Sequence, residues 1–413
     1  MIGIATVKPS TIARLPSGAN GELALSVHEH QDITAIDACD WDRLMDDAGL
    51  ANPFNCHGFL SLLERSGAVG NHSGWRSCHW SVELDGRVVA VMPLYIKAHS
   101  YGEYVFDFSW AQAYKQQGLD YYPKLLTAIP FTPISGTRLG LCSRLDSQQK
   151  SQVLDIVMAT IASRLTRGVS SWHALGIPES QAMSWQQRYS GVMRQTAQFH
   201  WFNDQYADFD DFLARLTAGK RKTIRKERRQ IASYGLSFRF LTADAIEPQH
   251  WQGFYACYQH TYLKLSGHQG YLPWAFFEGL GQLSLEVMLL VAEDSDKAMV
   301  ASALYFRDEE TLYGRYWGCL QELPLLHFEM CLYQGMDYCI EQRLACFNAG
   351  AQGEHKLLRG FEPVLMYSYH RLETSILSAA ITRYCHDERQ QVDHYVAQAR
   401  LCLPYKEAGN HRA

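Results

Sequence analysis

The 413-residue sequence lacks a long apolar run and an excess of positive charge. The most apolar run, from Val88 to Ile96, contains Pro93 and is far shorter than the roughly 20 residues that a membrane-spanning helix requires. The net charge of -5 excludes a protein whose whole surface binds nucleic acid. We therefore expect a globular protein without a transmembrane segment, in which any contact with a polyanion is local.

Paired cysteine motifs are also missing. The eleven cysteines include no C-x-x-C pair and are scattered among apolar residues, which favours buried, reduced thiols in a cytoplasmic protein. His327 and Cys331 are one helical turn apart, but no second ligand pair follows, so no metal site is predicted. The first residues have isolated positive charges and no apolar block, unlike a secretory signal.

Several familiar catalytic motifs do not occur. The sequence has no Gly-x-Ser-x-Gly elbow, His-Glu-x-x-His pair, Walker loop or Gly-x-Gly-x-x-Gly fingerprint. These absences argue against hydrolases, metalloproteases, nucleoside triphosphatases and dinucleotide-binding enzymes. If the protein is an enzyme, its chemistry fits a transfer between two bound partners, which requires positioning and one base.

One order of elements occurs twice along the chain. Its length exceeds the roughly 250–300 residues at which single cores stop growing, so two or three domains are expected. Residues 1–35 predict an irregular lead-in, and residues 376–413 predict a helical tail. Residues 36–205 and 206–375 each predict helices, an antiparallel hairpin, then a helix and a strand. The predicted fold class is α+β, with mixed, largely antiparallel sheets flanked by helices.

The elements of the two halves follow from periodicity and turn residues. The first half predicts helices beginning near Asp40 and Phe59, strands Cys78–Leu84 and Arg87–Lys97 around an Asp85-Gly86 turn, a loop rich in aromatic residues from Tyr101 to Pro133, helix Ser147–Thr166 and strand Ser170–Leu175. The second half predicts helices Phe209–Tyr234, Trp251–Lys264, Trp274–Leu283 and Leu325–Gln342, and strands Leu285–Glu293, Ala298–Phe306, Thr311–Trp317 and Ala345–Ala349.

A strongly basic segment runs from Lys220 to Arg229 within the predicted helix Phe209–Tyr234. Arg221, Arg225 and Arg228 recur at helical spacing, and such like charges repel one another unless anions offset them. The segment, including Lys222, therefore predicts either a phosphate-binding site or a solvated basic face.

A glycine-rich loop from Gly350 to Gly360 follows the predicted strand Ala345–Ala349. Gly353 would allow the backbone to approach a ligand closely. Glu354 or His355 could take a proton from an attacking amine, and Lys356 or Arg359 could hold an anion. The alternative is a charged surface turn.

Two further segments carry candidate residues. Glu103 and Asp107 lie among tyrosines. They predict general bases with raised pKa values, carboxylates that bind a substrate amine, or hydrogen-bonded structural carboxylates. Arg315 shares a strand face with Tyr313 and Trp317, so it is either a stacked structural arginine or an anion clamp.

Several strings resemble a bacterial FemAB-like family related to peptidoglycan biosynthesis, within the GNAT acyltransferase superfamily. They are His57-Gly58-Phe59-Leu60, Pro93-Leu94-Tyr95, His99 to Asp107, Tyr122-Pro123-Lys124, Pro130 to Pro133, Leu312 to Gly318, and Ala349 to Lys356. The resemblance extends from about Asp40 to His370. It implies two GNAT-like (acyl-CoA N-acyltransferase) domains in tandem.

The resemblance also implies a donor, for which two alternatives stay open. Fem-type enzymes take an amino acid from aminoacyl-tRNA, and Lys220 to Gly235 is similar to their Arg/Lys-rich helix. Ordinary GNAT enzymes use acyl-CoA, but Gly318 to Pro324 lacks the glycines of their pyrophosphate loop, and no extra pair of long helices for tRNA delivery is evident.

We therefore expect a cytoplasmic acyl or aminoacyl transferase that forms an amide bond on a small-molecule or lipid-linked amine, such as a cell-wall precursor or amino lipid. Glu354 or His355, with Glu103, would act as a base, and Arg315 would stabilise the oxyanion. The acceptor would lie in a groove between the halves, with Asp107, Tyr313 and Gly353 among the binding residues. The alternatives are a non-catalytic module that binds cell-wall fragments or anionic headgroups, and peripheral contact of the basic helix with a membrane.

Overall fold

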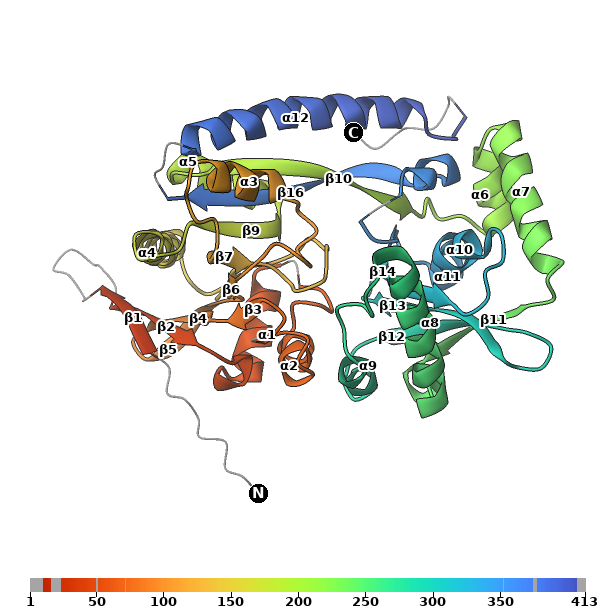
Figure 1. Cartoon of the computed structure of the whole chain (residues 1–413), viewed down its shortest axis with the longest axis horizontal. Coiled ribbons are helices and arrows are strands. Elements are labelled where there is room, and N and C mark those ends of the chain that lie inside the picture. The colour runs from red at the N-terminus through yellow and green to blue at the C-terminus, as the bar shows by residue number, and fades with distance from the viewer. Residues whose placement is uncertain are drawn as a thin grey trace, which may run out of the picture. The chain divides into compact units, whose positions relative to one another are not determined.

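The computed structural model describes residues 10–15, 24–49, 51–70, 72–351, 353–373 and 377–406. The chain divides into two units (Figure 1). Unit 1 comprises Met1–Thr196 and Met366–Gln391, and unit 2 comprises Ala197–Leu365 and Val392–Ala413. Three elements have residues in both units: β10 (Val192–Phe202), β16 (Glu362–Leu372) and α12 (Ser378–Leu401).

Unit 1 contains an antiparallel sheet in the strand order β1-β2-β4-β5-β8, and its part of a second sheet in the order β16-β9-β7-β6-β3. Its strands are β1 (Ser10–Leu15), β2 (Leu25–His30), β3 (Trp75–Ser77), β4 (His79–Leu84), β5 (Arg87–Met92), β6 (Tyr95–Lys97), β7 (Lys124–Thr127), β8 (Gly140–Leu141) and β9 (Ser171–Ile177). Its helices are η1 (Ile33–Ala35), α1 (Ala38–Asp47), α2 (His57–Arg65), α3 (Phe108–Gln116), α4 (Ser147–Leu165) and α5 (Glu179–Arg188).

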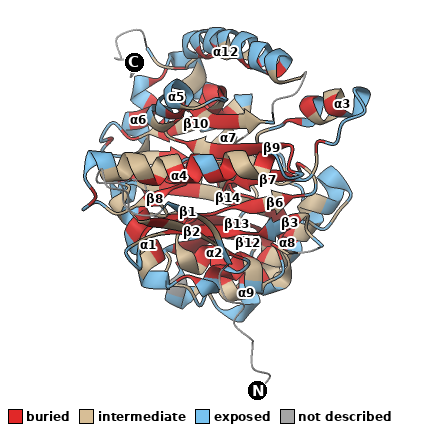
Figure 2. Ribbon diagram, turned by 90° about the vertical axis from the view of Figure 1, so that its left-hand side faces the viewer, coloured by how far each residue is buried: buried red, intermediate tan, exposed pale blue. Residues whose placement is uncertain are grey.

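The core of unit 1 forms where α4 packs on β1, β2 and β9. Val153, Ile156 and Ile161 of α4 are buried there, and capping by Asp146 begins the helix. Figure 2 shows that the strands are mainly buried whereas the outer faces of the helices are exposed. This burial pattern is what amphipathic helices on an apolar sheet produce.

Unit 2 contains the strands β11-β12-β13-β14-β15-β10 in that order, and all neighbours whose pairing is described are antiparallel except β14 and β15. Its strands are β11 (Ser237–Thr242), β12 (Val287–Glu293), β13 (Met299–Arg307), β14 (Thr311–Cys319) and β15 (Cys346–Asn348). Its helices are α6 (Phe209–Arg215), α7 (Ala218–Ala232), η2 (Ala243–Ala245), α8 (Pro248–Ser266), α9 (Trp274–Leu280), α10 (Leu326–Phe328), the π-helical turn η3 (Glu329–Tyr333), α11 (Gln334–Gln342) and the 3₁₀ helix η4 (Glu354–Arg359).

The two predicted hairpins are present. β4 and β5 join through Asp85 and Gly86, and both turn residues have positive φ angles (51° and 74°), as a two-residue hairpin loop requires. β12 and β13 form the equivalent hairpin in unit 2. The predicted strand Arg87–Lys97, however, is two strands, because Pro93 has no backbone N–H to continue a ladder.

The predicted single helix Phe209–Tyr234 is wrong. The structure has α6 and α7, separated by Leu216 and Thr217 in extended conformations. Thr217 donates its backbone N–H to the carbonyl of Pro404 (2.8 Å), and Leu216 forms a bridge with Tyr405. The C-terminal segment therefore satisfies backbone groups that a continuous helix would have paired internally.

The predicted irregular lead-in also differs from the structure. Within residues 1–35, β1 and β2 form an antiparallel pair at one edge of the five-stranded sheet. Leu25 and Val27 alternate towards the core of unit 1, which explains why β2 is a strand although its other residues are polar. The remaining residues of the predicted lead-in, 1–9 and 16–23, lie outside the described part.

No helix in the described part of the chain combines the length and apolarity that crossing a membrane requires.

Candidate active site

A pocket of about 90 Å³ opens in unit 2 where β14 and β15 separate. The two strands pair in parallel from Thr311 and Cys346 to Tyr313 and Asn348, and no pairing continues beyond this point in the described residues. The pocket is lined by residues of β13 and β14, the segment from α10 to η3, and the turn into η4: Ala303, Leu304, Tyr305, Gly314, Arg315, Tyr316, Trp317, His327, Cys331, Leu332, Ala349, His355 and Lys356. We call this space the splay pocket.

His355 lines the splay pocket and has a ring nitrogen without a hydrogen-bond partner in the described part of the chain. Its Nε2 atom is buried and has no hydrogen-bond partner among the described residues. The imidazole packs against His327 and Phe328, at centroid distances of 5.6 and 5.2 Å. Burial lowers the pKa of His355, and the positive charges of Arg359 and Lys356 lower it further, so the ring is neutral at neutral pH. A neutral imidazole in a pocket can accept a proton.

The backbone around η4 makes room for this ring. Gly353 has a φ angle of 116°, and a Cβ atom there would lie 2.5 Å from Cε1 of His355. Lys356 is buried, and its Nζ atom donates to the carbonyls of Ala349 (2.9 Å) and Gly350 (2.7 Å). Burial lowers the pKa of Lys356 to about 8. Gly353 therefore accommodates His355, and Lys356 fixes the loop in addition to lining the pocket.

Glu354 has a different environment from its neighbour. Its side chain is exposed and accepts a hydrogen bond from the hydroxyl of Tyr395 (2.9 Å), and it does not line the splay pocket. The sequence left Glu354 and His355 open as bases. The geometry favours His355.

Arg315 lies at an irregularity of β14. Leu304 pairs with Tyr316 and Tyr305 pairs with Gly314, so Arg315 is an extra residue between these pairs. Such a bulge re-aims a side chain, and Arg315 lines the splay pocket. Tyr313, predicted as a binding residue, instead donates its hydroxyl to Asp308 (2.7 Å) and does not line the pocket.

Arg359 connects the glycine-rich loop to the basic helix. Its guanidinium donates to the hydroxyl of Tyr333 (2.8 Å), to the carbonyl of His355 (3.0 Å) and to Glu227 of α7 (2.8 Å), and it stacks on Phe328. These contacts occupy the guanidinium of Arg359 with partners inside unit 2. They favour a role in positioning the glycine-rich loop over the predicted contact with an anion.

The basic helix α7 is partly neutralised by carboxylates of unit 2. Arg225 pairs with Asp210 (2.8 Å), and Arg228 pairs with Glu329 (3.0 Å) and Asp337 (2.6 Å). Internal carboxylates therefore offset part of the repulsion among the basic side chains. From the sequence alone, an external anion was expected to offset it. No ion pair of Arg221 or Lys222 occurs within the described residues, and Lys222 is exposed.

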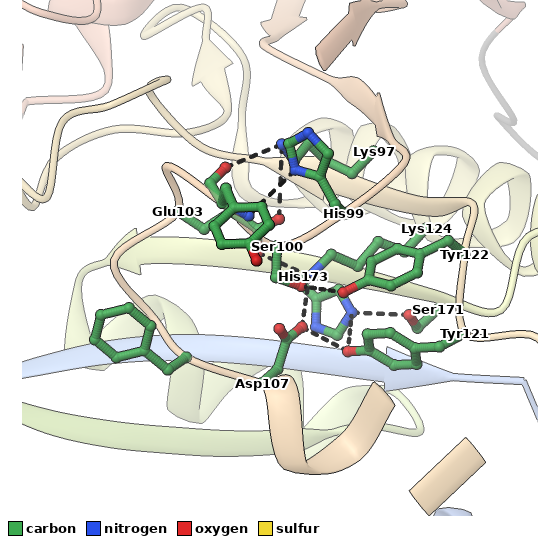
Figure 3. Close-up of polar contacts among 12 residues, drawn as sticks. Lys97, His99, Ser100, Glu103, Asp107, Tyr121, Tyr122, Lys124, Ser171 and His173 are labelled. Carbon is green, nitrogen blue, oxygen red and sulfur yellow. Dashed lines mark hydrogen bonds and ion pairs between the residues drawn. The ribbon is translucent and has the colours of Figure 1, made fainter. Parts of the chain in front are cut away.

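The predicted residues Glu103 and Asp107 lie in unit 1, in a buried cluster with two lysines (Figure 3). Lys124 donates to Asp107 (2.5 Å) and Glu103 (2.8 Å), while Lys97 is 4.0 Å from Glu103. Lys97 also lies over the ring of Trp75 at 3.8 Å and donates to the carbonyl of Tyr101. We call these four charged residues the lysine–carboxylate cluster.

Burial and pairing give these groups unusual pKa values. Burial raises the pKa of Glu103 to about 7 and lowers that of Lys97 to about 7, partly opposed by neighbouring opposite charges. For Asp107, the effect of burial is outweighed by Lys124 and His173, and its pKa falls to about 2. Lys124 is likewise stabilised as a cation by Glu103 and Asp107.

Sequence reasoning missed the histidines that extend the lysine–carboxylate cluster. Tyr121 donates to Asp107 (2.6 Å), and its hydroxyl lies 3.3 Å from His173. His173 and His370 share a hydrogen bond between their Nδ1 atoms (2.6 Å), and burial lowers the pKa of both rings. They are 197 residues apart in sequence, so only the pairing of β9 with β16 brings them together.

Within the described residues, no group of three or more His, Cys, Asp or Glu side chains is arranged to hold a metal ion. Cys331 of the splay pocket has its thiol pKa raised by burial. From the sequence, His327 and Cys331 were considered only as an incomplete metal-ligand pair and Cys331 as a buried thiol, because an isolated residue on a helix gives no signal of the pocket that it lines.

The fold class is confirmed as α+β with tandem GNAT-like domains. A family model named FemAB_like, described as peptidoglycan biosynthesis/recognition, matches residues 32–407. The chain belongs to this family, as the sequence strings predicted. None of the curated proteins matches the chain in sequence.

Several solved structures are similar at low sequence identity. The crystal structure of FemX is 10% identical, with 84% of this chain and 98% of that chain covered and a TM-score of 0.50. L-PGS from Bacillus licheniformis is 11% identical, with coverages of 84% and 96% and a TM-score of 0.48. A tandem GNAT protein from the clavulanic acid biosynthesis pathway is 10% identical, with coverages of 84% and 98% and a TM-score of 0.47. The likeness to FemX shows the fold alone.

Proposed function

We propose that the chain is an N-acyltransferase that transfers an acyl or aminoacyl group to an amine in the splay pocket. The observation that carries this proposal is the buried, unpartnered Nε2 of His355 at the place where β14 and β15 separate. Membership of the FemAB_like family supports a role in cell-wall biosynthesis or recognition. The acceptor is then a cell-wall precursor or an amino lipid.

In the proposed reaction, the amine nitrogen attacks the carbonyl carbon of the donor. A C–N bond forms, and the bond from the carbonyl carbon to the donor's leaving group breaks. His355 takes the proton that the amine loses and returns it to the leaving group. The product is an amide, and no oxidant or reductant is consumed.

The other residues position this chemistry. Arg315 supplies positive charge near the oxygen on which negative charge develops. Arg359 holds the backbone carbonyl of His355, and Lys356 holds the carbonyls before η4. Arg221 and Lys222 of α7 are proposed to contact phosphates of the donor or of a lipid-linked acceptor, since Arg225 is already paired.

A comparison of lipids and metabolites between a deletion strain and its parent tests the proposal. An amide-bearing species is expected to disappear on deletion and to return with the wild-type gene and with Glu354→Gln. It is expected not to return with His355→Ala. Full restoration by His355→Ala would exclude His355 as the base, and an unchanged set of amides would exclude the transfer itself.

A further inference from the structure

A second, more apolar cavity adjoins the splay pocket in unit 2. Its volume is about 240 Å³, larger than that of the splay pocket, and the two cavities share Trp317 and His327 as wall residues. We call it the lateral groove. Its wall includes Thr261 and Leu265 of α8 and three residues that precede or begin α10, namely Leu323, Leu325 and Leu326.

The charged groups of the lateral groove and one ring nitrogen of His260 have protein partners. Lys264 pairs with Glu322, and both side chains are more than half exposed, so this pair lies at the rim. His260 shares a hydrogen bond with the carbonyl of Cys319 (2.8 Å). Among its described wall residues, the lateral groove therefore offers a phosphate only the ammonium group of Lys264, which already pairs with Glu322, so it is poorly suited to bind a phosphate.

We propose that the lateral groove holds the aliphatic chain of the acyl group that is transferred, with its carbonyl in the splay pocket. This inference rests on the proposed function, because only an acyltransferase would bind this aliphatic chain as part of its donor. An aliphatic chain fits the leucine wall because burying each methylene removes apolar surface from water. Trp317 and His327 pack on each other with ring centroids 4.7 Å apart and belong to the walls of both cavities, so the two cavities are adjacent.

Binding of an aliphatic chain can be measured without any transfer reaction. Dodecanoic acid is titrated into the intact protein by calorimetry, and butanoic acid serves as the short-chain comparison. Binding is expected to strengthen with chain length, by up to about fourfold for each added methylene. Thr261→Trp, which fills the groove, and Leu265→Asp, which places a charge in its wall, are each expected to weaken dodecanoic acid binding at least about tenfold.

Two controls make the measurement specific. Leu401→Asp is matched to Leu265→Asp, because both leucines lie on helices of unit 2 and are 79% and 75% exposed, but Leu401 does not line the groove. Glu354→Gln changes an exposed side chain that lines neither cavity, and it is expected to retain dodecanoic acid binding. Because Leu265 is exposed, its variant is expected to fold, which Thr261→Trp need not do.

The outcomes separate this inference from the proposed function. Absent dodecanoic acid binding, or equal binding by Leu265→Asp and Leu401→Asp, overturns the groove assignment even if short acyl groups are transferred. Groove-dependent binding in a protein that transfers nothing supports the groove as a chain site and overturns the proposed function.

Discussion

The two units hold clusters of ionisable side chains in different environments. In unit 1, the lysine–carboxylate cluster is buried, and its cations and carboxylates face one another. In unit 2, His355 and Arg315 line an open pocket, and the free ring nitrogen of His355 faces no protein partner among the described residues. Glu103 and Asp107 also each keep one carboxylate oxygen without a hydrogen-bond partner among the described residues, so an unused atom alone does not mark a site. The difference is that His355 lines a pocket, whereas the four charged side chains of the cluster are buried against one another.

This comparison also changes the meaning of the unusual pKa values. The pKa of Glu103 is raised to about 7, yet burial accounts for the rise, and the two nearby lysines partly oppose it. Perturbed pKa values mark functional sites only in part, because structural ion-pair networks produce them too. We therefore propose that His355 is the base and that the lysine–carboxylate cluster is structural, and four experiments test that division.

The largest expected effect is on catalysis. His355→Ala should lower the rate of amide formation by about 10²–10⁴-fold, because a general base contributes that much. Stability should change little, since the Nε2 atom makes no hydrogen bond. Steady-state rates and thermal melting measure the two effects.

Glu354→Gln is the matched control for His355→Ala. Glu354 is adjacent in sequence but exposed and bonded to Tyr395, so its variant should keep a rate within about threefold of the wild type. If both variants lost the same share of the rate, the loss would come from a changed conformation of η4 and not from the absence of a proton acceptor.

The next largest effect is on the stability of unit 1. Lys124→Met leaves Glu103 and Asp107 buried without their shared cation, which should cost about 3–5 kcal/mol. The control is Arg188→Met, whose pair with Asp155 is exposed and should contribute less than about 1 kcal/mol. Urea unfolding measures both. A folded, stable Lys124→Met protein that had lost activity would contradict the structural role of the cluster.

The pH dependence of the rate distinguishes His355 of unit 2 from Glu103 of unit 1 as the base. His355 acts when neutral, and burial lowers its pKa below the ordinary 6.5. The rate should therefore be full above pH 6.5 and fall about tenfold per unit as the pH drops below the lowered pKa. Glu103, with a pKa of about 7, would place the midpoint near 7 instead. Measuring kcat/KM from pH 4.5 to 8.5 separates these midpoints.

Local patterns in the sequence predicted much of the fold. The Asp85-Gly86 turn, the β12–β13 hairpin and the helix at Trp251–Lys264 depend on neighbouring residues, and all three are present. The break between α6 and α7 depends on Pro404 and Tyr405, which lie far along the chain. No local period could reveal a partner so distant.

The candidate site was predicted in the same partial way. The sequence named His355, Lys356 and Arg315 as candidates because of their residue types and the neighbouring glycines, and all three line the splay pocket. It could not separate Glu354 from His355, because that choice depends on which side chain enters the pocket. It also assigned Arg359 to an anion, since the internal partner Glu227 is 132 residues away.

The smallest expected effect tests how closely His355 must be positioned. Gly353 and Gly350 both have positive φ angles, 116° and 87°, so alanine at either position should cost about 1–2 kcal/mol of backbone strain. Only at Gly353 would the new Cβ atom meet the imidazole of His355; at Gly350 the nearest atom is the carbonyl oxygen of Gly314, at 3.6 Å. Gly353→Ala should therefore lower the rate by up to about tenfold more than Gly350→Ala, because small displacements of a catalytic group slow transfer. Unfolding and rate measurements on both variants separate strain from displacement, and equal rates in the two variants would show that the imidazole tolerates the shift.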